Sequence, residues 1–562
     1  MKAVIHGLLP ANHWLRDYRQ ALLRPDLTAG LTTAVMLIPQ SMAYAMLIGL
    51  SPEVGLYASI VPLIVYALLG SSRQLAVGPV AILALMTAAS VGAHASPGSA
   101  DYLTLVILLA LMVGVLQLLM GVLRFGFLVN FLSHPVVSGF SSAAAIVIIV
   151  GQLKNLLNIE VPNTDQLLVM LGAILRHLDH THLPTLLVGI SSLAFMMVLK
   201  GWKPLFPAAL TAMVIATVFT WLFDLGQTGI ALVGPVPGGL PWPALPDVDA
   251  GSVLLLAPSA LAIALVGFVE AISVAKVFAR KNRYDIQANR ELVALGIANI
   301  TSGLFRAMPV TGGFSRTAVN AAAGGRTGLA SIITALVIAL VLMFFTSLFY
   351  YLPKAVLAAT IIMAALTLID LHEVRHLYRI KRSDLALLAI TFIATLLSGV
   401  EYGILAGISA SLVWFVVRTT RPHTAVLGKF PDRDVFRNIR RHPRAQTIPG
   451  ILMVRIDAQF YFGNASFLRE FICGQIKTAS VPVQALIIDA GSVTQLDSSA
   501  DAVLHEIFEE LAQRGIAIYI AEAIGPVIDV MKRSGLYQQL GADHFTWTVK
   551  EALELAQRKI AG

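Results

Sequence analysis

A long succession of apolar runs is the feature that most constrains this chain. Between about residues 25 and 420, apolar stretches follow one another with only short polar breaks. A helix needs about 20 apolar residues to cross a bilayer, and several of the runs approach that length. Of all residues, 57% are hydrophobic and 13% are charged, whereas a soluble domain carries about 25% charged residues. The sequence therefore predicts an α-helical integral membrane protein.

The charges in the breaks between these runs indicate how the chain is oriented. Breaks that follow even-numbered segments carry basic residues such as Arg73, Arg326 and the run RKNR at 280–283. Basic loops collect on the cytoplasmic side of a membrane, so both ends of the chain are predicted to be cytoplasmic. The same rule accounts for the net charge of +8 without a nucleic-acid partner. We expect about fourteen helical segments, near residues 28–48, 54–70, 75–92, 103–123, 128–152, 183–200, 205–223, 254–278, 288–303, 312–324, 327–347, 354–369, 383–398 and 401–418.

The composition changes to charged and mixed after the last apolar run. We expect a cytoplasmic N-terminal segment at residues 1–24, a transmembrane domain at 25–420, and a linker with a small α/β domain at 421–562. In that last region apolar strands alternate with helical stretches. The expected strands are 450–456, 484–490 and 515–521.

Several functional classes are excluded by what the sequence lacks. The tail after the last apolar run contains no P-loop, no metal cluster and no persuasive nucleophile constellation, so we expect no enzyme. We also expect no bound cofactor or metal. The single cysteine, Cys473, rules out an intramolecular disulfide.

Two short segments in the membrane region share an unusual pattern. The stretches AVGPVAILALM (76–86) and VTGGFSRTAVN (310–320) each have glycine or proline at the start of a helical run. They lie third and tenth in the series, seven segments apart. Matching broken segments in two halves indicate an inverted-repeat transporter, with the substrate between the half-helix N-termini. Free backbone N–H groups and the positive end of the helix dipole suit an anion there.

Two charges occupy places where a membrane protein rarely puts them. Arg316 falls in the first turn of the tenth segment, where it reinforces the positive dipole or, alternatively, extends to the membrane surface. Glu270 falls in the middle of the eighth segment, where an ionised carboxylate is costly without a partner or a cavity. A carboxyl group that changes protonation beside an anion site is a means of proton coupling. The alternative is a neutral carboxylic acid that bonds a neighbouring helix.

Several motifs resemble the SulP family of anion transporters. PEVGLYASIVPLIVYALLGSSR (52–73) closely resembles the family signature, with Val54 in place of the usual aromatic residue. The tail segment IIDAGSVTQLDSSADAVLHEIFEEL (487–511) resembles a STAS domain. The segments RPHTAVLGKFPDRDVFRNIRRHP and VRIDAQFYFGNASFL resemble plant-type proton-coupled sulfate transporters especially closely. Further motifs similar to the family are IPQSMAYAM (38–46), AVGPVAIL (76–83), NRYDIQANRELVALGIANI (282–300) and TGGFSRTAVN (311–320).

The resemblance implies a fold of fourteen transmembrane segments in a seven-plus-seven inverted repeat. Segments 1–4 and 8–11 would form a core domain, and segments 5–7 and 12–14 a gate domain. The anion would lie between half-helices 3 and 10, and Glu270 would be the proton-coupling carboxylate. Gly313 replaces a hydroxyl residue of some relatives, which removes one side-chain contact. The implied substrate-binding residues are Gln40, Tyr44, Pro79, Val80, Ala81, Gly313, Phe314, Ser315 and Arg316.

The STAS resemblance adds a regulatory possibility. The loop at LDSSA opens a helix and carries a phosphorylated serine in related domains, which makes Asp497, Ser498 and Ser499 candidate regulatory residues. The alternative is that Asp497 or Ser498 simply caps the helix, and this reading is favoured. The family is commonly dimeric, so a homodimer is expected.

Three functions remain open. The favoured one is a sulfate–proton symporter in the plasma (cell inner) membrane. The second, within the same family, is a bicarbonate or chloride transporter, either sodium-coupled or an exchanger. The third is a membrane-anchored regulatory scaffold that acts through its STAS domain. A scaffold has no need for Glu270 and Arg316 at membrane depth, so the two charges favour transport.

Overall fold

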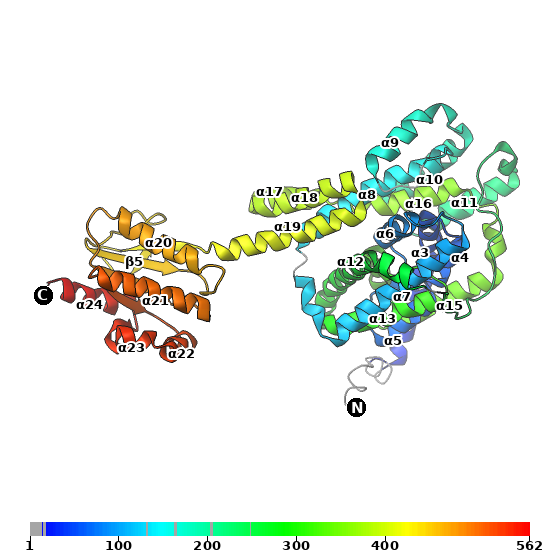
Figure 1. Ribbon diagram of the computed structural model, residues 1–562. Helices are drawn as coiled ribbons and strands as arrows, with labels where there is room; N and C mark the ends of the chain where they lie inside the picture. Colours follow the sequence, from blue (N-terminus) through cyan, green and yellow to red (C-terminus); the bar gives the residue numbers. More distant parts are fainter. Residues whose placement is uncertain are drawn as a thin grey trace. The chain divides into compact units, whose positions relative to one another are not determined.

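The computed structural model describes residue 14 and residues 18–130, 133–161, 166–202, 206–247 and 249–561. The chain divides into two compact units, one ending at Ser411 and the other running from Leu412 (Figure 1). The first unit is helical and the second combines helices with a sheet.

Each of the fourteen apolar segments predicted from the sequence coincides with helical structure. By length and composition, eight helical stretches among the described residues are long and apolar enough to cross a membrane. The helices are α3 (Leu23–Ile48), α4 (Pro52–Tyr57), α5 (Val61–Leu69), α6 (Ala81–Gly92), α7 (Ala100–Val122), α8 (His134–Leu157), α9 (Leu167–Arg176), α10 (Leu183–Trp202), α11 (Ala208–Leu222), α12 (Ala250–Asn282), α13 (Ala288–Leu304), α14 (Phe314–Ala322), α15 (Leu329–Phe344), α16 (Lys354–Leu366), α17 (Leu371–Ile380), α18 (Arg382–Ser398) and α19 (Val400–Thr420).

The helical structure differs from the sequence prediction in three places. The second segment is broken into α4 and α5, and Pro62 lies in the first turn of α5, where a proline costs no helical hydrogen bond. Helix α9 was not predicted, because ten residues are too few to stand out as a membrane segment. Helix α17 was not predicted either, since its many charged and histidine residues were interpreted as a basic loop.

Two short strands connect the halves of this unit. Strand β1 (Val77–Gly78) precedes α6 and strand β2 (Thr311–Gly312) precedes α14, and the two strands pair antiparallel. Elements in equivalent places of the two halves therefore run in opposite directions, as an inverted repeat requires. Val77 pairs with Gly312 and Gly78 with Thr311.

Glycines allow α7 and α13 to cross closely. A Cβ atom on Gly296 of α13 would lie 2.5 Å from the backbone nitrogen of Leu118 and 2.8 Å from the carbonyl oxygen of Gly114, both on α7. A Cβ on Gly114 would in turn lie 2.7 Å from the Gly296 carbonyl oxygen. Small residues at helix crossings give membrane helices their closest packing.

This crossing gives a prediction about stability. Changing Gly296 to alanine should cost at least about 2 kcal/mol, because the new methyl group meets rigid backbone and forces α7 and α13 apart. The measurement is the thermal unfolding midpoint of the purified full-length protein. Gly172→Ala on α9 is the matched control, since nothing lies within 4 Å of its Cβ position. Equal midpoints for the two variants would contradict the close crossing.

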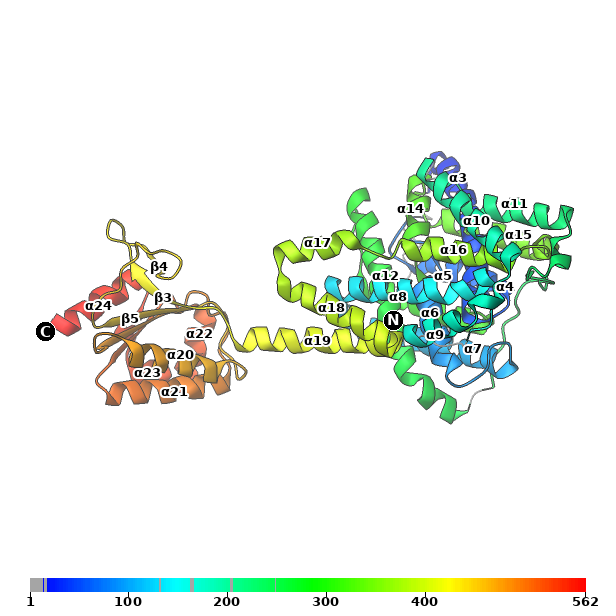
Figure 2. The same ribbon diagram turned by 90° about the horizontal axis from the view of Figure 1, so that it is seen from above.

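The second unit is a six-stranded sheet with helices on both faces (Figure 2). The strand order is β4-β3-β5-β6-β7-β8, with β5 to β8 parallel and β3 antiparallel to β5. Apolar side chains of α20, α21 and α22 pack on one face and those of α24 on the other. The strands are β3 (Thr424–Lys429), β4 (Phe436–Asn438), β5 (Ile451–Ile456), β6 (Ala485–Asp489), β7 (Ala517–Ala521) and β8 (Phe545–Thr546), and the helices are α20 (Ala465–Thr478), α21 (Ser498–Gln513), α22 (Gly525–Ser534), α23 (Leu536–Leu540) and α24 (Val549–Ala561).

Candidate functional site

The N-termini of α6 and α14 are brought together by the β1–β2 pair. Val80 is the N-cap of α6 and Gly313 is the N-cap of α14, and both have extended backbone. No side chain caps either helix. The first-turn N–H groups of both helices therefore have no capping acceptor, and each helix end carries roughly half a positive charge. Together the two ends form a site suited to an anion.

Arg316 joins the two half-helices. Its side chain is only 1% exposed. One Nη donates to the carbonyl oxygen of Pro79, and the other donates to those of Gly78 and Thr311, both at 3.2 Å. Arg316 thus does not extend to the membrane surface, which was the alternative interpretation of this residue. It ties the turn before α6 to the turn before α14.

The Nε–H group of Arg316 is left without a partner. This atom is buried and forms no hydrogen bond. The guanidinium also lies against two glycines, since a Cβ on Gly313 would be 2.9 Å from one Nη and a Cβ on Gly78 would be 3.3 Å from the other. Glycine at 313 therefore makes room for the arginine, in addition to removing the hydroxyl that some relatives carry.

Glu270 lies on α12, which contacts α6, β2 and α14. Glu270 lies within electrostatic range of Arg316, and both lie within that range of the Tyr44 hydroxyl of α3. Among the described residues no ion pair joins Glu270 to Arg316, and the buried Oε2 of Glu270 has no hydrogen-bond partner. The Thr311 hydroxyl donates to the carbonyl oxygen of Gly267 at 2.5 Å, which attaches β2 to the turn of α12 just before Glu270.

Other buried carboxylates of this unit fall into two kinds. Asp26 accepts hydrogen bonds from the backbone of Arg326 and from Thr327, and both oxygens of Glu291 are bonded by Tyr66 and Ser71. Glu53, in contrast, resembles Glu270 in having a buried oxygen without a partner. Of these carboxylates, only Glu270 is predicted from the sequence to lie in the middle of a membrane segment; Asp26, Glu53 and Glu291 fall near segment ends.

The other residues predicted to bind the substrate are distributed over α3, the start of α6 and the start of α14. Gln40 and Tyr44 are buried on α3. Pro79, Val80 and Ala81 form the start of α6. Ser315 and Gln40 line a cavity of about 110 Å³ together with residues of α10, α11 and α16. Phe314 is 57% exposed and packs against Phe278 of α12, with ring centroids 5.9 Å apart.

The sequence did not predict the role of two buried amide side chains, Asn299 and Gln117, which lie next to the chain that enters β2. Asn299 of α13 donates to the carbonyl oxygen of Val310 at 2.9 Å and accepts from its N–H at 2.8 Å, which fixes the chain entering β2. Gln117 of α7 accepts from Asn299 and donates to Ala264 of α12. Both amides sit inside strongly apolar segments, and this polarity in an apolar setting is the signal that could have identified them.

In the second unit, Asp497 is the N-cap of α21. Its carboxylate accepts from the Ala500 N–H at 2.8 Å, as the capping interpretation predicted, and from the Phe462 N–H at 2.8 Å. Ser498 and Ser499 follow it in the first turn and are exposed. Exposure leaves both hydroxyl groups accessible, and their modification stays a prediction.

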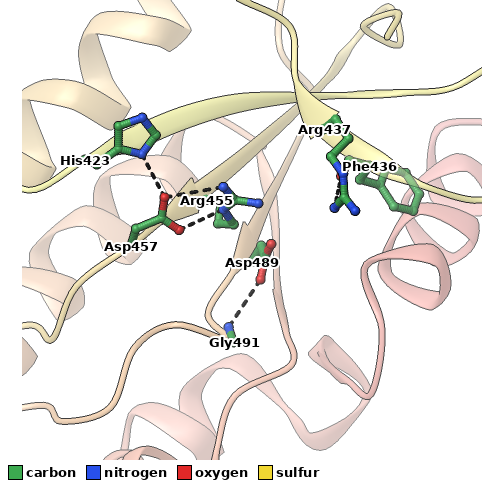
Figure 3. Close-up of polar contacts among 7 residues, drawn as sticks. All are labelled: His423, Phe436, Arg437, Arg455, Asp457, Asp489 and Gly491. Atoms are coloured by element: carbon green, nitrogen blue, oxygen red, sulfur yellow. Dashed lines mark hydrogen bonds and ion pairs between the residues drawn. The ribbon is translucent and has the colours of Figure 1, made fainter. Parts of the chain in front are cut away.

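A polar cluster lies at the carboxyl end of β5 and β6 (Figure 3). Asp457 accepts from His423 at 2.7 Å and from Arg455 at 2.8 Å. Burial disfavours the charged form of Asp457, but these hydrogen bonds outweigh it and hold its pKa below the ordinary value. Burial raises the pKa of Asp489, which accepts from the Gly491 N–H at 3.2 Å. Because His423 directly precedes β3, the pair fixes the chain as it enters the sheet.

Comparisons with known proteins agree with this architecture. A model of the sulfate permease family matches residues 23–391, and a STAS domain model matches residues 442–552. The chloroplastic sulfate transporter 4.1 of Arabidopsis thaliana is 39% identical over 98% of this chain and 83% of its own length. A probable sulfate transporter of Mycobacterium tuberculosis is 36% identical over 98% of this chain and 99% of its own. The murine solute carrier 26 member A9, an anion transporter solved in the inward-facing state, superposes with a TM-score of 0.92 at 25% identity, covering 99% of this chain and 95% of that one.

A membrane unit with paired half-helices, followed by a STAS domain, defines a class of anion transporters. This chain belongs to the sulfate permease (SulP) family. It is an integral membrane transporter of an inorganic anion and not an enzyme.

Proposed function

We propose that this protein is a sulfate–proton symporter of the plasma (cell inner) membrane, with both termini in the cytoplasm. The observation that carries the proposal is the meeting of two uncapped half-helix N-termini with the buried Arg316. Sulfate is favoured among anions because the similar plant and mycobacterial proteins are named as sulfate transporters. The homodimer stays a prediction.

Sulfate would lie between the first turns of α6 and α14. The backbone N–H groups from Ala81 onward and from Phe314 onward would donate to its oxygens. Gln40, Tyr44 and Ser315 would add side-chain donors, and the Arg316 Nε–H is available as a further donor. Glu270 would take up the proton that moves with the anion.

Two cavities support alternating access to this site. The cavity of about 110 Å³ lined by Gln40 and Ser315 lies between α3, α14 and the helices α10, α11 and α16. A second cavity, of about 450 Å³, is lined by Met46 of α3, Leu85 of α6 and Gln152 of α8. Both lie where the proposed core domain meets the proposed gate domain. Small movements at this contact would open the site to one side or the other.

The test is uptake of radiolabelled sulfate by proteoliposomes that contain the purified protein. We expect concentrative uptake when an inward proton gradient is imposed, and only equilibration without one. The alternative functions are tested in the same assay. A sodium gradient replaces the proton gradient, and unlabelled bicarbonate or chloride is added as a competitor. Uptake driven by a sodium gradient would contradict this proposal. Stronger competition by unlabelled bicarbonate than by unlabelled sulfate would contradict it as well. No uptake of any anion would favour the scaffold function.

The STAS domain is proposed to be cytoplasmic and regulatory, beginning after the linker at residue 421. It contributes none of the residues proposed to bind sulfate. Phosphorylation of Ser498 or Ser499 would add negative charge at the N-terminus of α21, next to the Asp497 cap.

A further inference from the structure

A third cavity lies outside the proposed transport pathway. It has a volume of about 440 Å³, is partly open, and is lined mainly by the segments that follow α5, α12 and α14. It shares no lining residue with the cavity at Gln40 and Ser315 or with the cavity at Met46. The three segments are far apart in the sequence, and each was predicted to be cytoplasmic.

Three arginines from different segments line this cavity: Arg73, Arg290 and Arg326. Among the described residues none of them forms an ion pair with a carboxylate. The Nε–H of Arg290 is buried and has no hydrogen-bond partner. Among the described residues that line the cavity, Asp285 is the one carboxylate, so this part of the lining carries an excess of positive charge.

The wall of the cavity is held in place by its own contacts. The Arg73 guanidinium stacks over the Tyr284 ring at 5.1 Å from its centroid. The Tyr284 hydroxyl donates to Gln74 at 2.6 Å, and the backbone N–H of Arg326 is bonded to Asp26 at 2.7 Å. The stacking positions the guanidinium of Arg73, and the bond to Asp26 fixes the backbone of Arg326; neither contact neutralises a guanidinium group.

The carboxylate of Glu291, the residue after Arg290, forms its hydrogen bonds within the wall of the cavity. It accepts from Tyr66 at 2.6 Å and from the backbone N–H and hydroxyl of Ser71 at 2.7 and 2.6 Å. Glu291 is fully buried and does not line the cavity. It fixes the loop after α5 against α13, and the arginines stay available for another anion.

We propose that this cavity binds a phosphate group, carried either by a membrane lipid or by a soluble compound. Guanidinium groups recognise phosphate with paired hydrogen bonds, and three of them match its charge and its several oxygens. The cavity is also within the range of about 300–1,000 Å³ that small-molecule sites occupy. Solvated arginines at a membrane surface would explain the charge alone, but they would not explain why three of them share one hollow or why the Nε–H of Arg290 is buried without a partner. The ligand is either an anionic lipid headgroup or a soluble phosphate compound.

The experiment measures the thermal unfolding of the full-length protein with named probes. One arm compares nanodiscs of phosphatidylglycerol with nanodiscs of phosphatidylcholine. The other adds ATP or inorganic phosphate in phosphatidylcholine nanodiscs. Stabilisation by phosphatidylglycerol alone identifies a lipid site, and stabilisation by ATP or phosphate identifies a soluble ligand. No stabilisation by any probe would overturn the proposal.

Variants assign the effect to this cavity. Arg290→Gln and Arg326→Gln should each weaken apparent affinity for the stabilising probe at least about tenfold, since each removes a charged hydrogen-bond donor. Arg326 is exposed, so its variant should fold even if Arg290→Gln does not. Arg379→Gln, an exposed arginine of α17, is the matched control and should bind as the wild type does. Equal losses in all three variants, or no loss at Arg290 and Arg326, would reject the site.

Discussion

Arg316→Ala is expected to abolish sulfate uptake, with at least about a 100-fold loss of transport efficiency. The substitution removes hydrogen bonds to the carbonyl oxygens of Gly78, Pro79 and Thr311. A hydrogen bond to a charged group contributes about 1.5–3 kcal/mol, and about 1.4 kcal/mol corresponds to a factor of ten. The three carbonyl dipoles would then point at the anion site without the cation that now offsets them. The two half-helices would lose contacts that hold them in place, and the anion site would lose positive electrostatic potential.

The lysine variant separates these two contributions. Arg316→Lys keeps the charge but cannot bond carbonyls on two separate turns with one rigid group, so it should recover only part of the activity. The measurements are sulfate binding by calorimetry and uptake in proteoliposomes. Arg379→Ala, on the exposed part of α17, is the control for expression and folding. Wild-type sulfate affinity in the alanine variant would remove Arg316 from the site and leave it a purely structural role.

Most helices of the membrane unit could be predicted because they lie in apolar runs bounded by polar residues. The two half-helices were also visible, since the glycines and prolines around Gly78 and Gly313 interrupt otherwise regular apolar patterns. Helices α9 and α17 were missed for the opposite reason. Helix α9 is apolar but only ten residues long, and α17 is amphipathic and rich in charged residues.

The contacts of the candidate site could not be predicted in the same way. Arg316 was placed at a helix N-terminus from its spacing, but its partners at Gly78 and Pro79 lie more than 200 residues earlier in the chain. They become neighbours only because β1 pairs with β2. The bonds of Asn299 to Val310 likewise depend on how α13 leads into β2. Such contacts follow from packing, which one sequence does not specify.

Glu270→Gln is expected to uncouple sulfate transport from protons. Glutamine imitates the neutral carboxyl group, so the variant should bind and exchange sulfate while losing uphill uptake driven by a proton gradient. A lone charge in the middle of a bilayer costs about 2.5–3.5 kcal/mol even on the lenient insertion scale. The buried, unpartnered Oε2 of Glu270 is therefore better tolerated when the group carries a proton.

Proton and sulfate should favour each other's binding at this site. Sulfate enters as a dianion that Arg316 and the two helix ends attract, while an ionised Glu270 nearby opposes it. Protonation of Glu270 removes this opposition. Because coupling between two binding sites is reciprocal, sulfate must tighten proton binding by the same factor. The expected result is a sulfate affinity that weakens as pH rises through the titration of Glu270.

The experiment is sulfate affinity measured across pH for the wild type, Glu270→Gln and Glu53→Gln. Glu53 is the matched control, because it too has a buried oxygen without a partner but is not among the proposed site residues. The pH dependence should disappear in Glu270→Gln and persist in Glu53→Gln. If it disappears only in the Glu53 variant, that residue is the coupling carboxylate. A wild-type affinity that is independent of pH would reject the mechanism, and continued uphill uptake by Glu270→Gln would place the coupling group elsewhere.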